Sequence, residues 1–141
     1  MPELNRDGLD LDSLFILLGK LYALADELQD SRSANLVIDK IIRWSDDYGW
    51  EPTGSVAELV YSITPEGSPL RKLFVQIFTH EAPAELEKAA HELPQALLAE
   101  IAVEYAGVLR SGKTRGTTIR ERRCKYYHRH DEGADDCNDD W

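Results

Sequence analysis

The longest run of periodic hydrophobic positions lies between Asp12 and Trp44, and it predicts two packed helices. In its first half, apolar residues recur at spacings of three and four, which is typical of one broad buried helix face. The residues that make up this predicted core face are Leu14, Phe15, Leu17, Leu18, Leu21, Tyr22, Leu24, Ala25 and Leu28. The second half repeats the spacing from Ala34 to Ile42, and the polar link between the halves predicts a helical hairpin.

Residues that cap helices mark where the predicted helices begin. Asp10 or Asp12 is placed to cap the first helix, and Ser31 or Ser33 the second. Ser68 followed by Pro69 predicts another start, because proline at the first helical position loses no hydrogen bond.

Three further segments complete the predicted set of helices. The ranges 55–63 and 82–93 form short amphipathic helices, and Pro94 opens a last long helix that ends near Arg110. No segment shows the alternation of a strand. The pattern therefore predicts an all-α fold, a bundle of five or six helices with a charged C-terminal tail.

Length and composition fit one domain, because 141 residues with 43% hydrophobic content can bury a core. We expect a flexible lead-in over 1–11, a helical interaction domain over 12–110 and a basic-then-acidic tail over 111–141. No apolar run reaches the ~20 residues of a membrane span, and no basic-then-apolar leader is present. These features predict an intracellular protein, cytoplasmic or nuclear, without a membrane partner.

Several short sequence strings resemble one known family. The strings are Gly19–Asp30 (GKLYALADELQD), Ala34–Asp39 (ANLVID), Gly67–Leu73 (GSPLRKL), and Cys124 with Tyr127–His130 (YHRH). They are similar, in the same order, to the C-terminal helical half of fungal BTB/POZ-domain proteins, where the first two read roughly LYxLADKLQ and LxNxxIDxI.

The resemblance implies a protein-protein interaction module with an adaptor or assembly role. BTB/POZ proteins self-associate and recruit partners, some of them as adaptors for cullin ubiquitin ligases. The family's N-terminal half, with its sheet and the usual dimer surface, has no counterpart before Met1. That is the pattern of a truncated relative or of a C-terminal half.

Charge is strongly segregated along the chain. The segment 110–130 holds eight Lys or Arg residues against Glu121 alone, a net charge of +7, which leaves −17 on the remainder of a chain whose total is −10. The segment therefore predicts, as an alternative function, nucleic-acid binding by phosphate contacts and base stacking. The residues of this alternative are Arg120, Arg122, Arg123, Lys125, Arg129, Tyr126 and Tyr127. Alternatively, the basic segment folds back onto the acidic remainder of the chain, and this interpretation explains its positive charge equally well.

The tail also contains four zinc-type ligands in a C-x3-H-x-H-x6-C pattern. These are Cys124, His128, His130 and Cys137. Zinc accepts such a set in tetrahedral geometry, so Zn²⁺ is the one cofactor that the sequence predicts. A solvated polar tail is the alternative, because short His- and Cys-bearing tracts are compositional hints only.

Catalysis has little support in the sequence, and we predict that the chain is not an enzyme. The string 107–114 (GVLRSGKT) matches the phosphate-loop pattern GxxxxGK[ST]. That loop needs a strand before it, whereas the pattern here predicts a helix that ends near Gly112. No Ser/His/Asp set or isolated carboxylate pair stands out.

Overall fold

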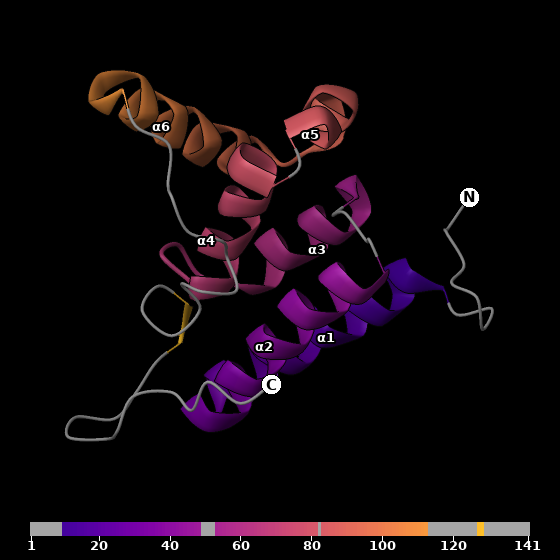
Figure 1. Cartoon of the computed structure of the whole chain (residues 1–141). Coiled ribbons are helices and arrows are strands. Elements are labelled where there is room, and N and C mark those ends of the chain that lie inside the picture. The colour runs from indigo at the N-terminus through magenta and orange to yellow at the C-terminus, as the bar shows by residue number, and fades with distance from the viewer. Residues whose placement is uncertain (1–9, 49–52, 82, 113–126, 129–141) are drawn as a thin grey trace.

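The fold is an all-α bundle, seen here in a computed structural model that describes residues 10–48, 53–81, 83–112 and 127–128 (Figure 1). The helices are α1 (Leu11–Glu27), α2 (Ser31–Tyr48), α3 (Gly54–Ile63), α4 (Pro69–Gln76), the π-helix η1 (Ile77–Glu81), α5 (Pro83–Ala89), the 3₁₀-helix η2 (Ala90–Glu92) and α6 (Gln95–Ser111). The described residues contain no strand, so the predicted fold class is confirmed.

The α1–α2 hairpin forms one side of the bundle. The two helices run antiparallel along the lower edge in Figure 1, and α3 packs against α1. Gly19 permits the close approach of α3, because a Cβ at this position would lie 3.3 Å from Cγ2 of Val60. Helix α4 lies between α3 and α6, and α6 and α5 form the opposite side of the bundle (Figure 1).

The core lies between these two sides. Its largest fully buried side chains come from α1, α2, α3, α4, η1, α6 and position 127. They include Tyr22, Phe15, Phe74, Phe78, Ile38, Ile41, Leu70, Leu73, Leu97 and Tyr127. The helical spacing of apolar residues after Pro69 also predicts five core positions, and all five are buried: Leu70, Leu73, Phe74, Ile77 and Phe78.

Among the described residues, four helix starts carry a side-chain cap, and two of these caps follow the sequence prediction. The Asp10 carboxylate accepts from the backbone N–H of Ser13 (3.3 Å), and the Ser68 hydroxyl accepts from that of Leu70 (3.3 Å). At α2, however, Asp30 replaces the predicted serines and accepts from the N–H of Ser33 (3.0 Å). Thr53 caps α3 one position before its first residue. Where several capping residues are adjacent, local sequence does not select among them.

Candidate interaction surface

Helix α1 has two apolar faces, of which only one is buried. Phe15, Leu18, Tyr22 and Ala25 face the core. A second row, Leu14, Leu17, Leu21, Leu24 and Leu28, follows spacings of three and four along the helix to its C-cap, and we call it the leucine stripe. Leu14 is partly buried, but the exposed fractions of the other four are 53%, 43%, 52% and 68% in chain order. The prediction that the whole apolar face of this helix is core was therefore wrong for those four leucines.

Both ends of α1 are fixed by hydrogen bonds. At its start, the hydroxyl of Ser13 donates to Asp10 (2.7 Å), and this bond is the main reason why the pKa of Asp10 is lowered. At its end, the backbone N–H of Asp30 donates to the carbonyl oxygen of Ala25 (2.8 Å). At the start of α2, the hydroxyl of Ser33 donates to Asp30 (2.5 Å) and lowers the pKa of Asp30 in the same way. The leucine stripe is thus presented on a helix with ordered ends.

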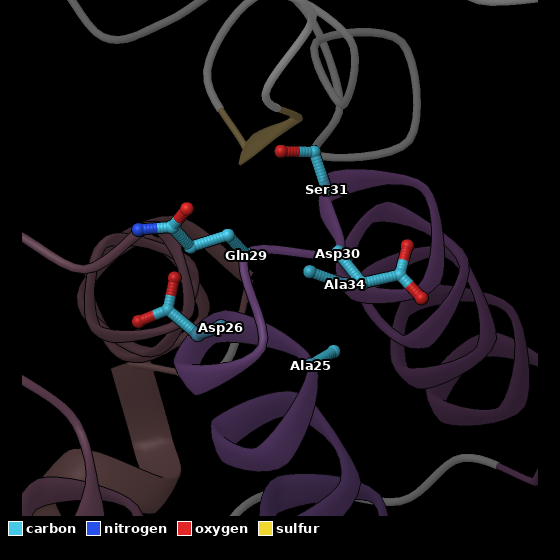
Figure 2. A pocket seen from close by; sticks show the side chains of 6 residues that line it. All are labelled: Ala25, Asp26, Gln29, Asp30, Ser31 and Ala34. Carbon is cyan, nitrogen blue, oxygen red and sulfur yellow. The ribbon is translucent and has the colours of Figure 1, made fainter.

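The hairpin turn encloses a small cavity of about 170 Å³ (Figure 2). Ala25 and Ala34 bring the two helices close together there, and the polar side chains of Asp26, Gln29 and Ser31 surround them. Gln29 has a left-handed backbone (φ 57°), which lets the chain reverse within a few residues. This cavity is a consequence of the turn, and its lining offers no buried charge for a ligand.

A second, shallow cavity of about 540 Å³ adjoins the leucine stripe. Its lining residues are Lys20, Ala23, Leu24, Asp26, Glu27 and Ile63. Leu24 belongs to both the cavity and the stripe, and the exposed Lys20 and Glu27 lie one heptad apart on the same flank. Exposed leucines beside a shallow, charged-rimmed cavity are typical of a protein-binding surface.

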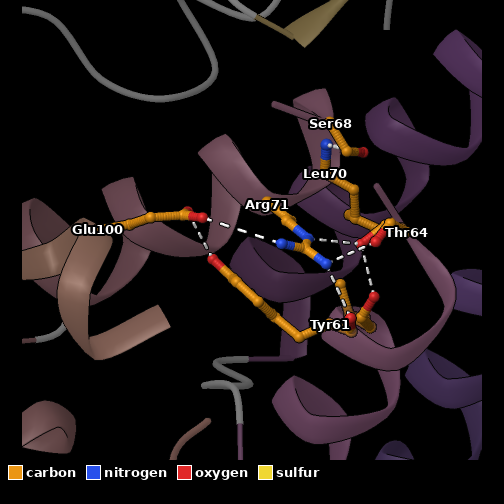
Figure 3. Close-up of polar contacts among 7 residues, drawn as sticks. Tyr61, Thr64, Ser68, Leu70, Arg71 and Glu100 are labelled. Atoms are coloured by element: carbon orange, nitrogen blue, oxygen red, sulfur yellow. Dashed lines mark hydrogen bonds and ion pairs between the residues drawn. The ribbon is translucent and has the colours of Figure 1, made fainter. Parts of the chain in front are cut away.

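Arg71 stabilises the opposite part of the molecule (Figure 3). Its Nη2 donates to the carbonyl oxygens of Tyr61 (2.8 Å) and Thr64 (2.5 Å), and its Nε donates to the Thr64 hydroxyl (3.0 Å). The guanidinium carbon also lies 4.4 Å from the centroid of the Tyr61 ring. Only 12% of the side chain is exposed. The sequence alone predicts that Arg71 and Lys72, which flank the apolar face of α4, both form a solvated rim. That prediction was wrong for Arg71 and is confirmed for Lys72, which is exposed.

Two carboxylates of α6 complete the contacts on this side. Glu100 accepts from the hydroxyl of Tyr61 (2.9 Å) and lies 4.0 Å from Nη1 of Arg71. Burial raises the pKa of Tyr61, and the bond to Glu100 raises it further. One turn later, Glu104 lies 3.0 Å from Nε2 of His80, which the π-helix η1 carries. These polar groups contact one another rather than an open cavity, which favours a structural role.

Among the predicted zinc ligands, the described residues include His128 alone. Its Nε2 lies 2.5 Å from Oδ1 of Asp39 on α2. An imidazole held by a carboxylate in this way is common among zinc ligands. Cys124, His130 and Cys137 lie outside the described residues, and in the part that is described no three His, Cys, Asp or Glu side chains gather to hold a metal. The zinc site stays a prediction.

One residue of the predicted nucleic-acid site, Tyr127, is not available for binding. Tyr127 is 1% exposed and belongs to the core, so its ring has no free face for a base. Arg120, Arg122, Arg123, Lys125, Tyr126 and Arg129 lie outside the described residues. In the string that matches the phosphate loop, positions 107–111 lie within α6, and Gly112 ends that helix with a φ of 67°. A helix therefore occupies the place of the strand that nucleotide binding needs.

Comparison of the chain with protein-family models, with curated proteins and with solved structures finds no match. None of the described helices combines the length and the apolar content that crossing a bilayer requires. Among the described residues, the leucine stripe is the longest row of exposed large hydrophobic side chains.

Proposed function

We propose that the chain is a protein-protein interaction module, rather than an enzyme, and that it binds its partner through the leucine stripe of α1. The single observation that supports this is the exposure of four leucines in one helical row. An isolated exposed leucine is ordinary on a protein surface. Four in register form a continuous apolar surface, which costs free energy in water unless a partner covers it.

The chemistry of the stripe indicates the kind of partner. Leucines spaced alternately by three and four match the a and d positions of a heptad, which pack against another helix. We therefore expect the partner to present an amphipathic helix. The sequence resemblance to fungal BTB/POZ proteins, an adaptor family, agrees with this proposal.

Site-specific photo-crosslinking tests the proposal directly. A photoreactive phenylalanine analogue replaces Leu24, which is 52% exposed within the stripe. In a matched control it replaces Leu36 on α2, which is 58% exposed and outside the stripe. In cells, the probe at Leu24 should form a discrete protein adduct, and the probe at Leu36 should form none or much less. Equal crosslinking from both positions would show that the stripe is not a binding surface.

A further inference from the structure

The leucine stripe is palindromic in its spacing. Leu17, Leu21, Leu24 and Leu28 are separated by four, three and four positions, so the row reads the same in both directions. Consider two antiparallel copies of α1 related by a two-fold axis that passes midway between Leu21 and Leu24. Leu21 of one copy then lies opposite Leu24 of the second copy, and Leu17 lies opposite Leu28. A two-fold symmetric interface requires this self-complementarity.

We propose that the partner of the leucine stripe is a second copy of this chain, with the two α1 helices packed antiparallel. This inference rests on the proposed function and names its partner. It also differs from a general apolar docking site, because the charges beside the stripe select one orientation.

Lys20 and Glu27 provide that selection. Both side chains are exposed, and both lie on the same flank of the stripe. In the antiparallel arrangement, Lys20 of one copy lies within about 3 Å along the helix axis of Glu27 of the second copy, because two residues separate their levels. Because of the two-fold symmetry, this attraction occurs twice in the dimer. In a parallel pair the two-fold axis runs along the helices and places the charged flanks of the two copies on opposite sides of the interface, so Lys20 and Glu27 would not pair.

The other flank of the stripe is already covered by the molecule's own core. Leu18 and Ala25, at the positions equivalent to Lys20 and Glu27 on that side, are both buried. A second helix can therefore approach only over the stripe and its charged flank. In this register the paired stretch runs from Leu17 to Leu28, so the contact extends over roughly 17 Å. An interface of one helix per copy is small, so we expect a dissociation constant of about 1–100 μM.

Sedimentation velocity on the purified full chain tests whether the dimer exists. Over about 1–200 μM, which brackets an interface of this size, the weight-average mass should rise from monomer toward dimer. Changing Leu21→Gln together with Leu24→Gln should weaken association at least about 30-fold, since each loses a buried leucine contact twice. The matched control is Leu36→Gln with Leu109→Gln, two leucines exposed elsewhere, which should leave association unchanged. Circular dichroism checks that both variants keep their helix content.

Charge reversal tests the orientation. Lys20→Glu alone and Glu27→Lys alone should each weaken the dimer roughly tenfold, because two attractions become two repulsions. The double variant, Lys20→Glu with Glu27→Lys, should restore wild-type association, since the pairs are re-formed with exchanged signs. In a parallel dimer the charged flanks do not face each other, so neither the single reversals nor the double variant would change association by more than about twofold.

Three results would overturn the inference: a monomer throughout the concentration range, a dimer unaffected by the two glutamines on the stripe, or charge reversals whose single variants do not weaken the dimer or whose double variant does not restore it. The proposed function fails separately. If the purified chain stays monomeric while the probe at Leu24 crosslinks a different protein, the stripe is a docking surface and only its assignment to a second copy is wrong.

Discussion

His128 and Asp39 are in contact although 89 positions separate them in the sequence: Nε2 of the imidazole lies 2.5 Å from a carboxylate oxygen. The side chain of His128 is only 4% exposed. Its neighbour Tyr127 belongs to the hydrophobic core. Tyr127 and His128 therefore attach the chain beyond α6 to the rest of the molecule. This part of the predicted tail belongs to the folded domain.

The first prediction concerns this attachment. Tyr127→Ala should lower the free energy of unfolding by roughly 2–5 kcal/mol, because it leaves a cavity where a large ring is buried. Urea denaturation followed by circular dichroism measures the loss. Leu109→Ala, at a leucine that is 83% exposed, is the control and should stay within about 0.5 kcal/mol of wild type. A similarly small value for Tyr127→Ala would mean that residue 127 does not belong to the core.

The second prediction concerns zinc. If Cys124, His128, His130 and Cys137 share one ion, protein purified without chelator should carry about one zinc per chain. Cys124→Ser or Cys137→Ser should remove it. Asp39→Asn should lower zinc affinity by about 10–100-fold, because Asp39 then no longer orients the imidazole as a charged acceptor. Elemental analysis and competition with a chromophoric chelator provide the measurements, and metal-free protein with fully titratable thiols would contradict the prediction.

Nucleic-acid binding, the third prediction, depends on the basic segment. At about 50 mM salt, fluorescence anisotropy should detect binding of labelled oligonucleotides, and binding should weaken steeply toward 200 mM if phosphates are the target. Replacing Arg120, Arg122 and Arg123 by Glu should abolish it. Tyr127→Phe should not affect it, because that ring lies in the core. A chain that retains no oligonucleotide at the lower salt concentration does not bind nucleic acid through this segment.

The sequence predicted the helices well, because helix periodicity and caps are local signals. It could not divide the apolar residues of α1 between core and surface. Phe15 and Leu17 both fit the wide apolar face, since burial in a core and burial by a partner demand the same side chains. What separates them is the position of α2 and α3, which is a property of the whole fold.

Contacts between distant residues left no signal in the sequence either. The pairs His128–Asp39 and His80–Glu104 join different elements, and neither has a characteristic spacing. Arg71 resembled a surface residue because most arginines are. Its burial follows from two backbone carbonyl groups at the end of α3, which need a donor once α4 covers them.

The fourth prediction follows from the lowered pKa of Asp30, whose ordinary value is 3.8. Because the folded-state pKa lies below the unfolded value, the unfolded chain binds more protons near pH 4, and stability rises with pH there. The stabilising contribution is present above the unfolded pKa and is lost as pH falls through the folded pKa. Asp30→Asn should keep the helix cap, since asparagine caps well, but should reduce the loss of stability between neutral pH and about pH 2.5. Urea denaturation across this range measures it.

A matched variant separates the cap from general acid effects. Glu87→Gln removes an exposed acid on α5 that caps no helix. The free energy of unfolding of this variant should fall with decreasing pH as steeply as that of the wild type. If Asp30→Asn and Glu87→Gln change the acid limb equally, the carboxylate of Asp30 has no special part in the pH dependence.

The last prediction concerns Arg71. Arg71→Lys keeps the charge but cannot reproduce the planar donor set that bonds both carbonyl groups and the Thr64 hydroxyl. Buried carbonyl oxygens then lose their donor, and the free energy of unfolding should fall by about 1–3 kcal/mol. The adjacent Lys72→Ala is the control, because that side chain is exposed and should change stability by less than about 0.5 kcal/mol. If Arg71→Lys is as stable as wild type in urea, the charge of Arg71 and not its hydrogen-bond geometry holds the end of α3 against α4.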